Sequence, residues 1–329
     1  MHRNVTTSSI ALLLSAALAA TAPAALAQSE KYPSRPIKLI VGYPPGGSTD
    51  VAARILADQL AKSLGQSVIV ENRSGASGTI GAASVAKSDP DGYTLLFGSA
   101  TDVANNRATI KNVPYETLKD FQPITLVGRV PFLLLTNSSV PANSVGQLIE
   151  WIKSNPGKVN YSTFGRGTTN HFAGESFKLA AGVDALPVPY KGSSPSLAGL
   201  MGGEVQYTFD SVTAALPALP SGRLKAIAIT APARSPLVPD VPTMAEAGLP
   251  GFVAGTWWGV LAPAQTPKPV IDRLHSTITE ILRSPETSKR FTDLGAQLVG
   301  NTPQEFAELI KSEGEKSVAL AARIGLKPE

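Results

Sequence analysis

The sequence of 329 residues contains no cysteine, and this absence excludes several kinds of site at once. A disulfide framework, a thiolate zinc site, a cysteine nucleophile and a lipid anchor on cysteine all require a thiol. Charge is sparse as well: 16% of the residues are charged, and the net charge is only +4. Lysines and arginines are scattered and never form a run of five. Nucleic-acid binding is therefore not indicated.

Long apolar runs are missing after the N-terminus, which carries the one such segment. Arg3 precedes an apolar stretch over residues 10–20, and Ala25-Leu26-Ala27 fits the small-x-small pattern of a signal-peptide cleavage site. The stretch is short and interrupted for a transmembrane anchor, which needs about 20 apolar residues. We expect residues 1–27 to be a cleaved signal peptide. Export without disulfides indicates a bacterial periplasm.

From Pro36 onward, short apolar runs alternate with longer amphipathic stretches. The first set predicts strands over 37–41, 67–71 and 93–98, and helices over 50–64 and 82–87. A second set begins after "KDFQP". It predicts strands over 124–127, 132–136, 159–163, 188–190, 205–209 and 226–230, and helices over 144–154, 171–181 and 195–201. Strand–helix–strand repetition with short connections is typical of an α/β fold with mostly parallel sheets covered by helices.

The C-terminal part follows a proline-rich segment that has no clear period. A strand is predicted over 257–261, and two helices over 268–283 and 303–322. We expect two α/β lobes, with the last part of the chain returning to the first lobe. The expected boundaries are 28–129 with 252–329 for lobe 1, and 130–251 for lobe 2. Ligands of open α/β sheets bind at the carboxyl ends of the strands, which places the site in the cleft between the lobes.

Motifs of common enzyme classes are absent from the sequence. It has no G-x-G-x-x-G, no Gly-Lys-Ser/Thr of a P-loop and no G-x-S-x-G nucleophile elbow. After the signal segment only two histidines remain, His171 and His275, and no cluster has metal-ligand spacing. Carboxylate pairs leave little trace in a sequence, so catalysis stays open as an alternative without support. We expect no catalytic residue, no metal and no cofactor.

Two loops share an unusual design. "YPPGGSTD" (43–50) and "FGRGTTNH" (164–171) each follow a predicted strand, carry two glycines and then present adjacent hydroxyls before a predicted helix. Helix N-termini have unpaired N–H groups and partial positive charge, so they bind anions. Either loop alone is explained as well by ordinary N-capping. Two such loops, one in each lobe, favour a shared anion in the cleft.

Neighbouring residues add candidates, each with an ordinary structural explanation beside it. Tyr43 and Phe164 precede the glycines and either flank a ligand or pack at a strand end. Arg166 either pairs with a carboxylate or is a solvated loop charge, and Asp210 either meets a ligand hydroxyl or amine or caps the next element. "FGSATD" ends a strand, and "PYKGSS" opens a third helix. The candidate ligand-binding residues are Tyr43, Gly46, Gly47, Ser48, Thr49, Asp50, Ser99, Ala100, Thr101, Phe164, Gly165, Arg166, Gly167, Thr168, Thr169, His171, Tyr190, Lys191 and Asp210.

Several of these motifs carry a family resemblance. "YPSRPIKLIVGYPPGGSTDVAARIL", "VPYKGSSPSLAGLMGGEVQYTFDS" and "RSPLVPDVPTMAEAGLPGF" are similar to the Bug-type receptors, the periplasmic solute-binding proteins of tripartite tricarboxylate transporters. The likeness covers essentially the whole mature chain. It implies a two-lobed, type II-like periplasmic binding fold that closes like a Venus flytrap on a small organic acid. It also implies that the two loops hold a carboxylate through N–H groups, hydroxyls and ordered water.

The resemblance implies delivery of the acid, a mono- or dicarboxylate of aliphatic or aromatic kind, to the membrane subunits of such a transporter. We expect a monomer. One departure concerns Asp102: where the family often reads Thr-His-Ala-Ile-Asn-Pro, this chain reads Thr-Asp-Val-Ala-Asn-Asn over 101–106. An acid there would disfavour a second carboxylate or select a polar group. Two alternative functions stay open, a sensing receptor that docks a sensor kinase and an enzyme that processes carboxylates.

Overall fold

The structure is a computed structural model that describes residues 32–328. The chain divides into a segment that ends at Ser34 and one compact unit that begins at Arg35, and the two lobes both belong to this unit. The predicted signal peptide, residues 1–27, lies outside the described residues. Within those residues, no helix has both the length and the apolar character that a membrane crossing requires.

A first sheet is built by the N-terminal strands and by the returning C-terminal part of the chain. β1 (Ile37–Val41) pairs in parallel with β2 (Val68–Asn72) and β3 (Thr94–Ser99), and β9 (Gly255–Pro263) joins β3 in the antiparallel sense. The short β10 (Gln297–Leu298) pairs with β4 (Phe121–Asn137). We call this sheet and its helices the first lobe. Its helices are α2 (Ser48–Leu64), α3 (Thr79–Ala86), α4 (Thr117–Asp120), α9 (Lys268–Arg283), α10 (Pro285–Thr292) and α11 (Pro303–Arg323), with the short η1 (Ala76–Gly78), η2 (Thr101–Asn105) and η3 (Asn106–Ala108).

A second sheet is built by the middle of the chain, and we call it and its helices the second lobe. β7 (Tyr207–Ser211) and β8 (Leu224–Ile229) pair antiparallel with β4, while β5 (Asn160–Thr163) lies parallel to β7 and to β6 (Leu186–Pro189). The helices of this lobe are α5 (Val145–Ser154), α6 (Thr169–Ala181), α7 (Ser193–Gly202) and α8 (Val212–Ala215), with the short η4 (Leu219–Ser221). The fold is therefore α/β with two lobes, as expected.

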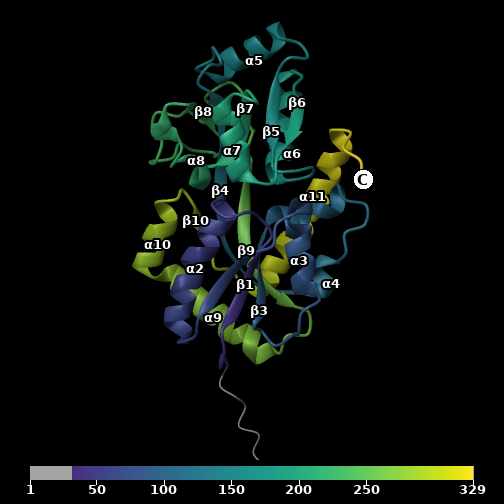
Figure 1. Cartoon of the computed structure of the whole chain (residues 1–329), viewed down its shortest axis with the longest axis vertical. Helices are drawn as coiled ribbons and strands as arrows, with labels where there is room; N and C mark the ends of the chain where they lie inside the picture. The colour runs from purple at the N-terminus through teal and green to yellow at the C-terminus, as the bar shows by residue number, and fades with distance from the viewer. Residues whose placement is uncertain (1–31, 329) are drawn as a thin grey trace, which may run out of the picture. The chain divides into compact units, whose positions relative to one another are not determined.

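One strand belongs to both sheets. The first part of β4 pairs with β9 as far as Pro131, and its last part, from Phe132, pairs with β7 and β8. Figure 1 shows β4 and β9 running between the two groups of elements. The sequence predicted two separate strands here, which is wrong. Prolines and glycines weaken a strand pattern, but Pro123 and Gly128 are accommodated by two shifts of register against β9.

Each lobe has its own hydrophobic core. In the second lobe, Phe177 packs edge-on against both Tyr207 and Phe209. In the first lobe, Trp257 meets Phe306 of α11 at a ring distance of 5.6 Å, which fixes the C-terminal helix to the first sheet. Burying a side chain of this size contributes about 1.5–3 kcal/mol, so each lobe has a separate source of stability.

Three helices begin two residues earlier than the sequence predicted. α2 starts at Ser48, α6 at Thr169 and α7 at Ser193. The residues just before α2 and α6, Gly47 and Thr168, are extended. The residue before α7, Gly192, has a φ of 120°, which favours glycine. The shift matters because it makes these hydroxyl residues the first residues of their helices, where backbone N–H groups have no partner inside the helix.

Candidate functional site

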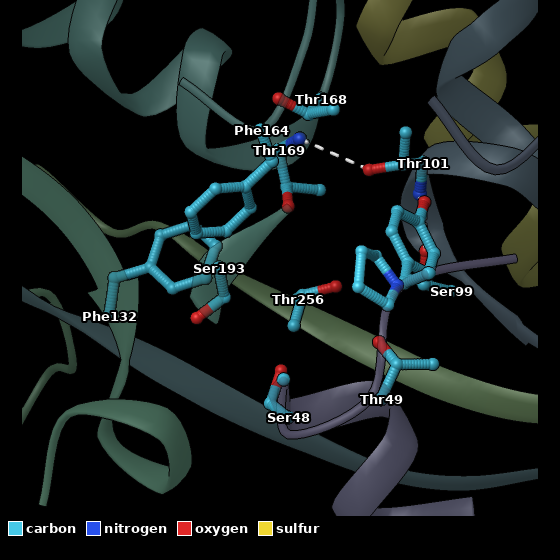
Figure 2. Close-up of a pocket in the computed structure, with 13 residues that line it drawn as sticks. Ser48, Thr49, Ser99, Thr101, Phe132, Phe164, Thr168, Thr169, Ser193 and Thr256 are labelled. Atoms are coloured by element: carbon cyan, nitrogen blue, oxygen red, sulfur yellow. Dashed lines mark hydrogen bonds between the residues drawn. The ribbon is translucent and has the colours of Figure 1, made fainter. Parts of the chain in front are cut away.

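A cavity lies between the lobes, where the N-termini of these three helices meet. Its volume is about 40 Å³, which suits a group of a few heavy atoms. The lining residues come from both lobes and are mostly hydroxyl-bearing or aromatic, as Figure 2 shows. They are Tyr43, Pro44, Gly47, Ser48, Thr49, Ser99, Thr101, Phe132, Phe164, Thr168, Thr169, Ser193 and Thr256.

The three helices that begin at the cavity lack side-chain caps. Gly47, Thr168 and Gly192 precede them, and none of the three accepts a hydrogen bond from the first turn through its side chain. By contrast α5, α10 and α11 are each capped by a serine or threonine hydroxyl. The Thr168 hydroxyl donates to the carbonyl of Gly165 at 2.8 Å and does not accept from the first turn of α6. One N–H of these first turns is used, that of Thr169, which donates to Thr101 Oγ1 at 3.2 Å. Helix N-termini without side-chain caps are suited to hold an anion.

Asp50 stabilises the loop of the first lobe. It accepts hydrogen bonds from the Gly46 N–H at 3.0 Å, from Arg54 and from Asn72. Burial works against its charged form, but these donors outweigh burial and lower the pKa of Asp50 below its ordinary value. Asn72 also donates to the carbonyl of Tyr43 at 2.9 Å. The loop is therefore fixed from behind by an ionised carboxylate.

His171 stabilises the matching loop of the second lobe. Its Nδ1 accepts a hydrogen bond from the Gly167 N–H at 3.0 Å, and burial lowers the pKa of this histidine, which favours the neutral ring that such acceptance requires. Gly167 has a φ of +74°, and a side chain there would collide with Thr109 of the first lobe. Glycine is thus required at this position both by conformation and by the close approach of the lobes.

Direct hydrogen bonds join the lobes around the cavity. Ser77 Oγ donates to the carbonyl of Arg166 at 3.0 Å, and Ser194 Oγ donates to the carbonyl of Pro45 at 3.1 Å. The Arg166 guanidinium donates to the carbonyl of Lys327 at 2.8 Å. The lobes are therefore in direct contact, and we call this arrangement closed.

Two buried carboxyl groups lie behind serines of the cavity wall. Asp102 accepts hydrogen bonds from Ser99 Oγ at 2.5 Å and from the Ser99 N–H at 2.8 Å, and burial raises its pKa to about 6. Asp210 accepts from Ser193 Oγ at 2.6 Å and from the Ser211 N–H at 2.7 Å, and burial raises its pKa to about 7. Neither carboxyl lines the cavity itself, but each accepts a hydrogen bond from a serine that does.

The model of the tripartite tricarboxylate transporter family receptor matches residues 52–326. The chain belongs to this family. It is 41% identical over 305 residues to protein BugT of Bordetella pertussis, covering 92% of this chain and 94% of that one. Among solved structures, R. palustris Rpa4515 with adipate superposes with a TM-score of 0.88 at 36% identity, covering 91% and 100% of the two chains. MatC from Rhodopseudomonas palustris with bound malate has a TM-score of 0.83 at 34% identity, covering 88% and 99%.

The receptor thus has the family and the fold that the sequence resemblance implied. Its cavity brings together most of the residues of the two glycine loops that the sequence nominated. The nominated residues that line it are Tyr43, Gly47, Ser48, Thr49, Ser99, Thr101, Phe164, Thr168 and Thr169. Four lining residues were not nominated, namely Pro44, Phe132, Ser193 and Thr256. Pro44 lies inside the first glycine loop, and Ser193 lies in the stretch "PYKGSS". Ser193 repeats the signal of a hydroxyl after a glycine at a helix start, whereas Phe132 and Thr256 lie inside strands and carry no such signal.

Other nominated residues lie outside this cavity. Asp50, His171 and Asp210 act from behind it, and Arg166 contacts Lys327. Tyr190 donates its hydroxyl to Glu204 at 2.7 Å. Gly46, Gly165 and Gly167 belong to the two loops but do not line the cavity. Lys191 is exposed, and Ala100 lines a second cavity that is described below.

A second, larger cavity of about 1000 Å³ lies between α6, α11 and the segment 248–255. Thr169 and Thr256 line both cavities, so the two spaces meet at these side chains. Arg129, Lys316 and Arg323 line the larger one together with apolar residues. Within residues 32–328, no group of three or more histidine, aspartate or glutamate side chains could hold a metal ion.

Proposed function

We propose that this receptor captures a small organic carboxylate in the interlobe cavity and delivers it to the membrane subunits of a tripartite tricarboxylate transporter. The observation that carries the proposal is the meeting of three helix N-termini without side-chain caps at one cavity between the lobes. Unpaired N–H groups with partial positive charge stabilise an anion there. Hydroxyls of Ser48, Thr49 and Thr169 supply further donors.

A carboxylate fits this cavity better than other anions. The loop "YPPGGSTD" has prolines at two positions where a phosphate cradle needs N–H groups, and their rings stiffen the loop before a ligand arrives. Phe132 and Phe164 give the cavity an apolar side that suits the carbon skeleton of an organic acid. Relatives of similar fold are described with adipate and with malate, both of which are carboxylates.

Several parts of the proposal go further than the family assignment. We propose that the protein binds and releases its ligand without converting it, and that it works as a monomer. Cleavage after Ala27 in the periplasm belongs to the proposal as well. So do the lobe boundaries, with residues up to 129 and from 252 in the first lobe. The dual pairing of β4 around Pro131 supports the first of these boundaries.

The test is a thermal-shift screen in which each acid is paired with its methyl ester or amide. The set includes mono- and dicarboxylates, benzoate, nicotinate and acidic amino acids. A ligand of the folded state alone adds about 2.7 kcal/mol at 100 times its dissociation constant, which raises the melting temperature by several degrees. We expect an acid to raise it and its ester to fail. If esters, sugars or nucleotides stabilise the protein as strongly as any acid, the proposal is wrong.

A further inference from the structure

Ser193 is held in one orientation by a buried carboxylate. It is the first residue of α7, it lines the cavity, and its Oγ donates to Asp210 Oδ2 at 2.6 Å. A carboxylate oxygen only accepts hydrogen bonds, so the single hydroxyl hydrogen of Ser193 is used on Asp210. The other carboxyl oxygen, Oδ1, accepts from the Ser211 N–H at 2.7 Å, which prevents the carboxylate from turning. Asp210 itself is fully buried.

With its hydrogen used, the Ser193 oxygen can only accept from a ligand. Within residues 32–328 no group donates to this oxygen. Ser99, the other serine held by a buried acid, differs: its oxygen lies 3.0 Å from the Tyr43 hydroxyl and accepts from the Thr101 N–H at 3.3 Å. The two serine–aspartate pairs are therefore not equivalent, because the Ser99 oxygen already has partners within the protein.

We propose that Ser193, positioned by Asp210, selects carboxylates that also carry a hydrogen-bond donor, either a hydroxyl or an ammonium group. This inference rests on the proposed function, since the carboxylate is what brings the ligand to the helix N-termini. Figure 2 shows Ser193 beside Phe132 and Phe164, on the other side of the cavity from Thr49 and Thr101. The hydroxyl or ammonium group of the ligand would thus bind on the second-lobe side of the cavity, next to Phe132 and Phe164.

The ionised form of Asp210 is required for this orientation, which sets the conditions of the test. Burial raises its pKa to about 7, and hydrogen bonds from Ser193 and Ser211 oppose burial, with no charged side chain contributing. Titrations are therefore made at pH 8.5, where the carboxylate is ionised. At low pH a protonated Asp210 would donate to Ser193 and release the serine hydrogen towards the cavity.

The first experiment compares derivatives of one skeleton by isothermal titration calorimetry. The skeleton is that of the acid with the largest melting shift, tested unsubstituted and with a hydroxyl, an amino or an oxo group at carbon 2. For a three-carbon acid these are propionate, lactate, alanine and pyruvate. We expect the hydroxy or the amino derivative to bind about tenfold more tightly than the unsubstituted and oxo acids, since one hydrogen bond separates them. Whichever of the two binds more tightly identifies the donor.

Two variants then connect this preference to Ser193. Ser193→Ala should reduce the affinity ratio between the donor-bearing acid and the unsubstituted acid to about one. In Asp210→Asn the amide oxygen stays on the Ser211 N–H, so the amide nitrogen faces Ser193 and frees the serine hydrogen for the cavity. That variant should raise the affinity of the oxo acid to about that of the hydroxy acid, because both an oxo and a hydroxyl oxygen can accept from the freed serine hydrogen. A purely structural effect would lower both affinities together and leave their ratio unchanged.

The neighbouring Ser194 is the matched control, because its hydroxyl bonds Pro45 across the lobes and does not line the cavity. Ser194→Ala should keep the wild-type ratio. The proposal is wrong if the unsubstituted or oxo acid binds wild type as tightly as the donor-bearing ones, or if Ser193→Ala retains the ratio. If a variant does not fold, the wild-type series still decides. Failure of every acid to bind would instead remove the proposed function, and this inference with it.

Discussion

The backbone N–H of Thr169, the first residue of α6 in the second lobe, donates a hydrogen bond to Thr101 Oγ1 in the first lobe across 3.2 Å (Figure 2). Both residues line the cavity. Thr101 accepts this bond and keeps its own hydroxyl hydrogen, for which the neighbouring Tyr43 hydroxyl is a partner within the protein. The bond joins one residue from each lobe, so it forms only when the lobes are in contact, and it brings both residues to the cavity wall.

Replacing Thr101 by valine should weaken binding much more than folding. The substitution keeps the shape but removes the acceptor of the Thr169 N–H, and a lost hydrogen bond costs about 0.5–1.5 kcal/mol, or up to about tenfold in affinity. Thr101→Ser keeps the oxygen and should bind nearly as wild type. Calorimetric titration beside urea melts measures both quantities. Equal affinity in the valine and serine variants would contradict this role.

Substitutions of the adjacent Thr168 and Thr169 should have different effects, one on stability and the other on ligand affinity. Thr168 Oγ1 lies 2.8 Å from two acceptors within its own loop, the Gly165 carbonyl and Asn170 Oδ1, and its single hydrogen is shared between them. Thr169 shows no such bond within residues 32–328 and lines the cavity. Thr168→Val should therefore lower the free energy of unfolding by about 1 kcal/mol, while Thr169→Val should lower ligand affinity. The same two measurements test this, and a larger affinity loss at Thr168 would reverse the assignment.

The sequence predicted the lobes and most strands because strand and helix periods are local properties. Its main error in the fold, the division of β4, concerns a strand whose pairing changes at Pro131 from one sheet to the other. No local pattern contains that information, because it depends on partners more than 100 residues away, such as Gly255.

The part of the candidate site that could be nominated from the sequence is the part built by glycine-containing loops with adjacent hydroxyl residues. Glycine–hydroxyl loops locate helix N-termini, so Ser48 and Thr169, which line the cavity at the starts of α2 and α6, could be nominated from the sequence. The roles of Asp50 and His171 were not predictable, since a polar residue beside a loop either faces the ligand or holds the loop. Only the geometry shows that both accept hydrogen bonds from loop N–H groups. Thr256 was missed because a threonine in a strand pattern carries no sign of the cavity beside it.

Stability should depend on pH through the buried acids. Burial raises the pKa of Asp210 to about 7 from an ordinary 3.8, so between about pH 4 and 7 the folded state holds a proton that the unfolded chain has released. Stability from this group is therefore full below pH 4 and is lost as the pH rises to 7, by about 1.4 kcal/mol for each pKa unit. Asp102, with a pKa of about 6, adds a loss in the same direction.

Urea melts of wild type and Asp210→Asn at pH 5 and pH 8 test this linkage. Because the variant cannot titrate at this position, its stability relative to wild type should improve as the pH rises. The difference between the proteins cancels contributions of other groups, including Asp50, whose lowered pKa acts only at more acidic pH. A difference that stays constant between the two pH values would show that Asp210 has an ordinary pKa.

The C-terminal helix should help to hold the closed form. Phe172 of α6 packs in a small apolar cluster with Ala108 and Ala321 of the first lobe, against which Leu320 and Leu326 also pack. This contact buries apolar surface between the lobes, so it stabilises the closed arrangement alone. Phe172→Ala should shift the equilibrium towards an open form and raise the apparent dissociation constant of the ligand, about tenfold if the closed form loses 1.4 kcal/mol.

Small-angle scattering without ligand measures the same shift directly, because an open form of Phe172→Ala should have a larger radius of gyration than wild type. Leu179→Ala, on the same helix but 53% exposed, is the matched control and should change neither the affinity nor the radius. If Phe172→Ala lowers the melting temperature but leaves both affinity and radius unchanged, the cluster serves only the stability of α6.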